Sequence, residues 1–188
     1  MHAGRRNLLG HLILGSFAGL ICLPGAKPAK AGLPPIPQEK HERYMRLAIE
    51  QGKKNPYFPF GAVIVRPATD EVVASGINNA RENPTLHGEI VCLNDYIARN
   101  GNKGFEELVL YTTCEPCPMC MTALIFAKIG GVVFATYNAE GLKKAGFDSI
   151  KISARQLVDA TPFSQLQLLQ GGVLAAETDR MFLERKRY

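Results

Sequence analysis

The spacing of apolar side chains along this 188-residue chain changes several times, and each change predicts a new element. In the first element Tyr44, Leu47 and Ala48 recur at helical spacing. The apolar and β-branched runs that follow are short, as in buried strands. The predicted elements are a helix over 39–51, strands over 60–66 and 71–77, helices over 86–99 and 118–128, strands over 108–112, 132–137 and 165–169, and a helix over 173–184.

The order of these elements predicts the fold class. The first two strands are separated by four residues rich in turn formers, which favours an antiparallel hairpin. The later strands alternate with helices, which favours parallel pairing with helices on both sides of the sheet. We therefore predict a three-layer α/β/α fold around a mixed five-stranded sheet.

Residues 1–31 do not fit this domain. They contain no acidic residue, begin with a basic segment that includes Arg5 and Arg6, continue with an apolar run and end on Ala-Lys-Ala. This arrangement is typical of a cleaved signal peptide, and the arginine pair indicates the twin-arginine type. An ordinary secretory signal or an N-terminal anchor is the alternative. Glycines and Pro24 interrupt the run too early for a membrane span.

The rest of the chain is then divided into a Pro- and Gly-rich linker over residues 32–38 and one catalytic domain over residues 39–188. We expect this domain in the periplasm or secreted. Removal of residues 1–31 takes away four basic residues and no acidic one, so the net charge falls from +5 to +1. The basic character of the chain is thus poor support for a nucleic-acid partner.

Two short motifs carry the chemistry. His87-Gly88-Glu89 opens one predicted helix, and Cys117 and Cys120 open another within Pro-Cys-Pro-Met-Cys. Cysteines three apart at a helix start project from one face and can share an ion, to which His87 adds a third ligand. Three protein ligands leave one tetrahedral position open, which is typical of catalytic rather than structural zinc. We predict one Zn²⁺ per chain.

Glu89 follows the predicted histidine ligand by two residues and need not bind the metal itself. A carboxylate beside an open zinc position can move protons between water and substrate, so we predict Glu89 as general acid and base. For the two cysteines the alternative is a disulfide, since an exported protein meets an oxidising compartment. Cys114 is an alternative fourth ligand, and Cys92 is predicted to be a buried apolar residue.

The motifs together resemble the cytidine deaminase-like superfamily of zinc-dependent deaminases. The similar segments are 59–65, 84–89 and 113–120, together with Asn78, and they point to the branch of bacterial guanine deaminases and tRNA adenosine deaminases. Residues 145–148 and 161–163 and a basic C-terminus are similar to guanine deaminases. The resemblance spans about residues 39–188.

The resemblance implies further site residues. Asn78 would bind the base, and the Gly88 N–H would donate to a ring carbonyl. Asp148 would line the pocket. Tyr188 would close the pocket of a second subunit, which implies a homodimer with exchanged C-terminal segments. Phe60 is either a stacking residue or part of the core.

Two departures from the family pattern affect the expected pocket. Ser149 stands where guanine deaminases carry a second acidic residue, so a second proton relay would be lost or moved to Asp148. The segment from Asn78 to His87 is about two residues shorter than usual, and Gly88 replaces the usual alanine.

The predicted function is hydrolytic removal of an amino group from a free guanine-like base or related aminated heterocycle, with release of ammonia. The alternatives are a tRNA adenosine deaminase, a cytosine or nucleoside deaminase, and a zinc-stabilised binding module without turnover. An export signal and a nearly neutral domain disfavour the tRNA substrate.

Overall fold

The computed structural model describes residues 32–187. The predicted signal peptide, residues 1–31, and Tyr188 lie outside the described residues. The helices are α1 Gln38–Lys53, α2 Gly88–Asn100, α3 Pro118–Phe126, α4 Ala154–Asp159 and α5 Ala175–Leu183, with a 3₁₀ turn η1 Phe105–Glu107 and a π turn η2 Asn138–Leu142. The strands are β1 Gly61–Arg66, β2 Glu71–Ile77, β3 Val109–Cys114, β4 Gly131–Thr136 and β5 Leu168–Gln170.

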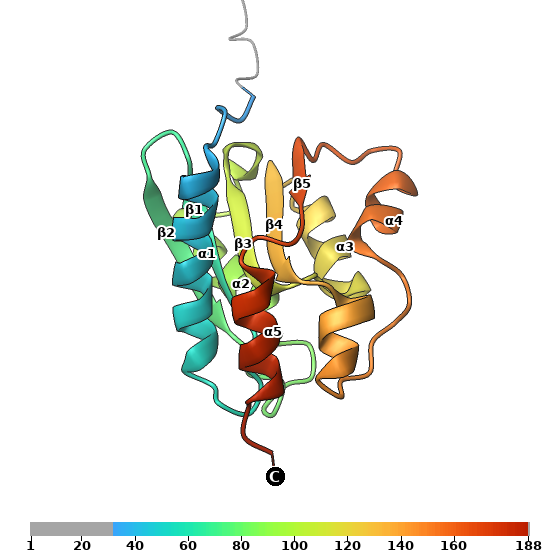
Figure 1. The fold of residues 1–188 in the computed structure, drawn as a ribbon. Helices are drawn as coiled ribbons and strands as arrows, with labels where there is room; N and C mark the ends of the chain where they lie inside the picture. The colour runs from blue at the N-terminus through green and yellow to red at the C-terminus, as the bar shows by residue number, and fades with distance from the viewer. Residues whose placement is uncertain (1–31, 188) are drawn as a thin grey trace, which may run out of the picture.

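The five strands form one mixed sheet in the order β2-β1-β3-β4-β5. β1 is antiparallel to both β2 and β3, whereas β3, β4 and β5 are parallel to one another. α1 and α5 cover one face, and α2 and α3, with α4 beside α3, cover the other (Figure 1). This arrangement confirms the predicted three-layer α/β fold.

Both faces of the sheet are buried, because apolar side chains alternate along each inner strand. In β1, Ala62 and Ile64 belong to the core under α2 and α3, while Val63 and Val65 belong to the core under α1. All four are at most 1% exposed. The packing of the helices on these two faces determines which helix ends lie beside which strand ends.

Close backbone approach brings the start of α2 onto the sheet. A Cβ atom at Gly76 of β2 would lie 2.2 Å from the Gly88 carbonyl oxygen, so only glycine fits at this position. A Cβ atom at Gly61 would likewise meet the backbone of Gly52 at the end of α1. These glycines place the first turn of α2 and the start of β1 side by side.

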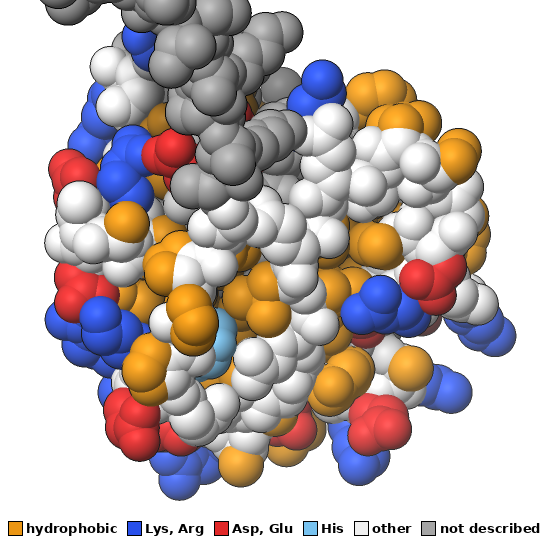
Figure 2. Space-filling view, turned by 90° about the horizontal axis from the view of Figure 1, so that it is seen from above, with side chains coloured by type: hydrophobic (Ala, Val, Ile, Leu, Met, Phe, Trp, Pro, Cys, Tyr) orange, Lys and Arg blue, Asp and Glu red, His pale blue; other side chains and the backbone are white. Residues whose placement is uncertain are grey.

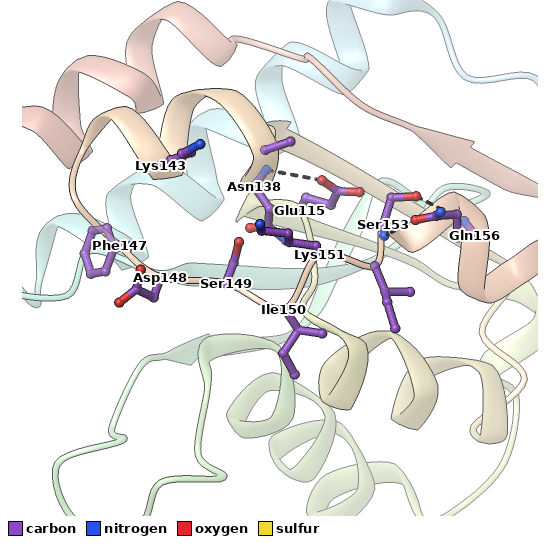
Figure 3. A pocket seen from close by; sticks show the side chains of 12 residues that line it. Glu115, Asn138, Lys143, Phe147, Asp148, Ser149, Ile150, Lys151, Ser153 and Gln156 are labelled. Carbon is purple, nitrogen blue, oxygen red and sulfur yellow. Dashed lines mark hydrogen bonds between the residues drawn. The ribbon is translucent and has the colours of Figure 1, made fainter.

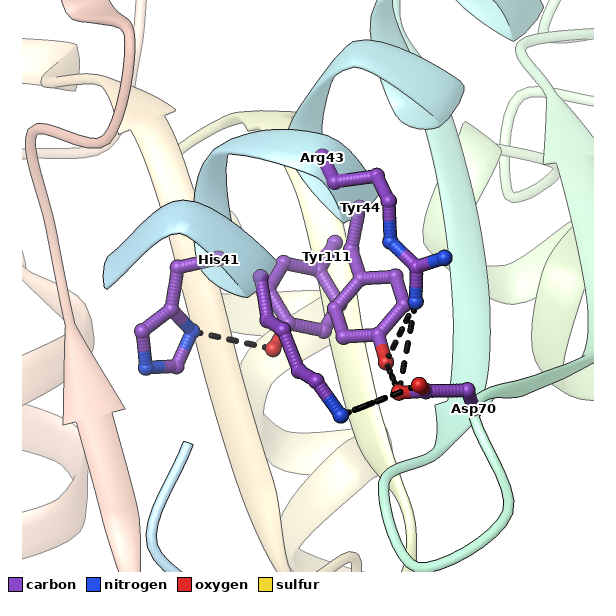
Figure 4. Close-up of polar contacts among 6 residues, drawn as sticks. His41, Arg43, Tyr44, Asp70 and Tyr111 are labelled. Atoms are coloured by element: carbon purple, nitrogen blue, oxygen red, sulfur yellow. Dashed lines mark hydrogen bonds and ion pairs between the residues drawn. The ribbon is translucent and has the colours of Figure 1, made fainter. Parts of the chain in front are cut away.

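A polar network anchors α1 to the hairpin loop (Figure 4). The buried His41 ring shares a 2.9 Å hydrogen bond with the Tyr111 hydroxyl of β3. Tyr44 donates to Asp70 in the loop between β1 and β2, and Lys40 and Arg43 approach the same carboxylate at 2.8 and 3.2 Å. Burial lowers the pKa of His41, so its ring is neutral at neutral pH.

Several parts of the chain differ from the prediction, among them the short η1 and η2, which were not predicted. α4 was not predicted, although Ser153 and Gln156 form the reciprocal capping box that marks a helix start. β5 is shorter and starts later than predicted, because Gln167 and Leu168 first donate to the Gly130 carbonyl before the strand pairs with β4.

The outer surface carries mixed charge. Seen from above, at the end of the molecule where α1 begins, basic and acidic side chains alternate around a partly apolar centre (Figure 2). Among the described residues, none of the helices is both long enough and apolar enough to cross a bilayer.

Candidate metal centre and active site

Two helix N-termini meet at the carboxyl end of β3. His87 is the N-cap residue of α2, and Cys117 is the N-cap residue of α3 with Pro118 in the first turn. Neither start has a side-chain oxygen cap, and the first N–H groups of a helix point beyond its N-terminus. The helix dipoles there favour thiolates and other anions.

The three predicted ligands come together in this space. The Sγ atom of Cys117 lies 3.6 Å from Nδ1 of His87, and the ligand atoms of His87, Cys117 and Cys120 all lie within 4.8 Å of one another. Cys120 is fully buried and His87 and Cys117 are partly buried. Neither Cys117 nor Cys120 forms a disulfide in the structure, so the alternative of a disulfide between them has no support.

The electrostatics of this group suit a cation. A hydrogen bond from Cys120, followed by the one to His87, lowers the pKa of Cys117 to about 4, while the same Cys120 bond and burial raise the pKa of Cys120. The two sulfurs thus share one proton, which a bound cation replaces. One nitrogen and two sulfurs form a donor set that zinc prefers, so the residues fit this metal.

Glu89 lies at the second position of α2 and is only 5% exposed. One of its oxygens, Oε1, accepts a 3.1 Å hydrogen bond from the hydroxyl of Thr112, which is 1% exposed. Burial raises the pKa of Glu89, and the neighbouring Cys117 raises it further. Such a buried setting with a raised pKa is typical of carboxyl groups that transfer protons.

Thr112 was not identified from the sequence, because a threonine in a buried strand has no distinguishing motif. Glu115 was also missed. Its carboxylate accepts bonds from the backbone N–H groups of Asn138 at 3.2 Å and Ala154 at 2.9 Å. Glu115 thereby ties the segment just before Cys117 to η2 and α4.

Cys114 does not join the metal group. Its Sγ donates to the Asn138 side-chain oxygen at 3.2 Å, and the residue packs with Leu142 and Phe182. The alternative of a fourth cysteine ligand therefore has no support in the geometry. Cys92 is fully buried in the core under α2, in line with its predicted role as a small apolar residue.

The residues expected to contact the substrate lie in different settings. Asn78 is 8% exposed, and its side-chain oxygen accepts from Ala80 N–H in an Asx turn. Phe60 packs in an aromatic cluster, with ring centroids 5.2 Å from Phe147 and 4.9 Å from Phe182. The substrate roles of Asn78 and Phe60 remain predictions.

Gly88 permits close contact between α2 and the start of β1. A Cβ atom there would lie 2.9 Å from the carbonyl oxygen of Phe60, which also accepts from Asn78 N–H. An alanine at this position would push these two backbones apart. Gly88 thus allows both ends of the short segment between Asn78 and His87 to lie against the Phe60 backbone.

Asp148 lines a cavity of about 450 Å³ between η2 and α4 (Figure 3). Glu115 forms part of the same wall, but none of the three candidate ligands lines this cavity. Asp148 and Ser149 are exposed on the segment between η2 and α4. Their contact with a substrate remains a prediction, and the predicted pocket residue Tyr188 lies outside the described residues.

Comparison with known proteins agrees with this site. Residues 38–136 match the family described as the cytidine and deoxycytidylate deaminase zinc-binding region. The guanine deaminase of Bacillus subtilis strain 168 is 34% identical over 114 residues, which cover 57% of this chain and 71% of that protein. A tRNA-specific adenosine deaminase of Streptococcus pyogenes serotype M1 is 30% identical over 149 residues, covering 76% and 81%.

A solved structure of a guanine deaminase from Nitrosomonas europaea superimposes with a TM-score of 0.66 and 20% identity, covering 85% of this chain and 97% of that one. At this identity the likeness establishes the shared fold. The match over residues 38–136 and the converging histidine and cysteines show that the chain belongs to the cytidine and deoxycytidylate deaminase family of zinc-dependent hydrolytic deaminases.

Proposed function

We propose that this deaminase removes the exocyclic amino group of a free guanine-like purine base and releases ammonia. The observation that carries the proposal is the convergence of His87, Cys117 and Cys120 beside the buried carboxyl group of Glu89. One soft cation site and one proton carrier, both at uncapped helix N-termini, are what hydrolytic deamination of an aromatic ring needs.

In this proposal His87, Cys117 and Cys120 would hold zinc. Zinc bound there would supply the nucleophile, a water whose pKa is lowered to about 7. Glu89 accepts the proton of that water and passes it to a ring nitrogen. It then carries the proton of the added hydroxyl group to the amine, so that the C–N bond breaks, a ring carbonyl remains and ammonia leaves.

Thr112 and the start of α2 orient these groups. The Thr112 hydroxyl donates to Oε1 of Glu89 and so holds the carboxyl group in place. The N–H of Gly88 at the uncapped start of α2 is a donor for a ring carbonyl. We assign base recognition to Asn78, Asp148 and Tyr188 and stacking to Phe60.

The choice of a small base is supported by charge and by relatives. The domain without residues 1–31 carries a net charge of only +1, whereas RNA binding favours a basic surface. The Bacillus subtilis relative is a guanine deaminase. The second candidate is tRNA adenosine deamination, which is favoured by the longer aligned stretch shared with the Streptococcus pyogenes enzyme.

Ammonia release from guanine, adenine, cytosine and cytidine, measured in parallel with inosine formation in tRNA, separates these candidates. We expect turnover of guanine or a closely related base and no inosine in tRNA. Glu89→Gln should abolish turnover while zinc stays at about one ion per chain. Turnover that survives in this variant would refute Glu89 as the proton carrier. Loss of zinc from the variant would indicate that Glu89 binds the metal instead.

We also propose that the enzyme acts outside the cytoplasm as a homodimer. The support is the signal-like sequence of residues 1–31 and the family resemblance of the C-terminus. Fractionation of cells that express the full chain, with Arg5 and Arg6 changed to lysine as the comparison, tests twin-arginine export. Light scattering of a chain without Lys186–Tyr188 tests whether the tail is needed for assembly.

A further inference from the structure

The chain turns back on itself directly after α5. The guanidinium Nη1 of Arg185 donates to the carbonyl oxygens of Ala145 at 2.6 Å and Phe182 at 2.9 Å. The same group lies over the ring of Phe147, 4.0 Å from its centroid. The next residue, Lys186, donates its backbone N–H to the Pro56 carbonyl at 2.9 Å. Arg185 therefore joins the end of α5 to the segment that carries Asp148.

Phe147 in turn packs against Phe60, whose backbone lies beside the start of α2. Its ring meets Phe60 edge-on at 5.2 Å, and Phe60 also packs against Phe182 at 4.9 Å. The carbonyl of Phe60 accepts from Asn78 and touches the start of α2 at Gly88. A continuous set of contacts thus runs from the tail to the helix that begins after His87.

The segment after Phe147 has little packing of its own. The side chains from Asp148 to Lys151 are all exposed. Its far end is fixed where Ala154 donates to Glu115. At its near end, Phe147 lies beside Asp148 in the view of the cavity (Figure 3). The position of Asp148 therefore depends on how firmly the residues before it are held.

We infer that Arg185 is a positioning residue, which holds residues 145–147 against Phe60 and so sets the place of Asp148 beside the substrate pocket. A planar guanidinium stacks on an aromatic ring and donates in its own plane at the same time, which a lysine cannot do. The inference rests on the proposed function only in taking Asp148 to border the substrate.

The test is the variant Arg185→Met in the zinc-loaded full chain. Arg187→Met is the matched control, because it removes the same charge from the same tail at an exposed position. Endoproteinase Lys-C cleaves after lysine, and Lys143 and Lys144 are exposed just before the clamped residues. We expect cleavage there to be about tenfold faster in Arg185→Met, the factor for loss of one charged contact of this kind.

Steady-state kinetics give the second measurement. We expect the KM of the best substrate to rise about tenfold in Arg185→Met, with kcat within about twofold, since Arg185 does not touch the reacting atoms. Arg185→Lys should restore neither property fully. Arg187→Met should match the wild type in both, and the zinc content should be unchanged.

A double-mutant cycle with Phe147→Leu distinguishes a local clamp from general weakening. If Arg185 acts through Phe147, the double variant is cleaved no faster than Arg185→Met alone. Additive effects, or an equal rise in cleavage for Arg187→Met, would overturn the inference. Because cleavage needs no substrate, a failed clamp and a wrong choice of substrate are told apart.

Discussion

Thr112→Val tests whether the orientation of Glu89 matters for turnover. The change replaces a hydroxyl by a methyl group of similar volume on a strand residue that is 1% exposed. It removes the 3.1 Å hydrogen bond to Oε1 of Glu89 and leaves that oxygen without the donor. A hydrogen bond to a charged group contributes about 1.5–3 kcal/mol, so the loss is large if it is felt in the transition state.

At about 1.4 kcal/mol for each factor of ten, this loss lowers kcat by about 10- to 150-fold. KM should stay within about twofold, because the Thr112 hydroxyl bonds to the proton carrier Glu89. Thr112→Ser keeps the hydroxyl and should recover most of the rate. Ammonia release at saturating substrate, with zinc measured on the same sample, is the assay.

Two outcomes would refute this reasoning. Equal rates for Thr112→Val and the wild type would show that Glu89 needs no partner on β3. Equally slow Thr112→Val and Thr112→Ser enzymes would show that side-chain volume, rather than the hydroxyl, determines the rate. A rate loss that follows zinc loss would place Thr112 in metal binding instead.

Three further predictions concern metal, packing and pH. Zinc binding at neutral pH should release at least one proton, as calorimetry in buffers of different ionisation enthalpy can measure. The hydrogen bonds with Cys117 raise the pKa of Cys120 and of His87, whereas zinc binds the thiolate and the neutral imidazole; no release would contradict this. Gly76→Ala should lower the free energy of unfolding in urea by about 1–3 kcal/mol or more, because its Cβ would lie 2.2 Å from the Gly88 carbonyl oxygen, whereas Ser75→Ala should change it by less than about 0.5 kcal/mol. Burial lowers the pKa of His41 below 6.5, so the unfolded chain binds a proton at this residue more readily than the folded chain does. The free energy of unfolding should therefore fall as the pH drops below about 6.5, and urea titrations of His41→Gln should show a weaker fall.

The sequence alone determined the candidate metal ligands and most of the fold. His87 and the Cys117–Cys120 pair are set by local helix starts, and the period of apolar residues located nine of the elements within a few residues. Both signals are local, so they need no knowledge of how distant segments pack. The short α4 was missed although its capping box was present in the sequence.

Only the tertiary structure could identify the residues that act at a distance along the chain. Thr112 reaches Glu89 across 23 positions, and Arg185 reaches Ala145 across 40. Gly88 is required because the Phe60 backbone passes against it. Each of these contacts exists because the sheet brings β1, β3 and the end of α5 together, and no local sequence pattern encodes such a meeting.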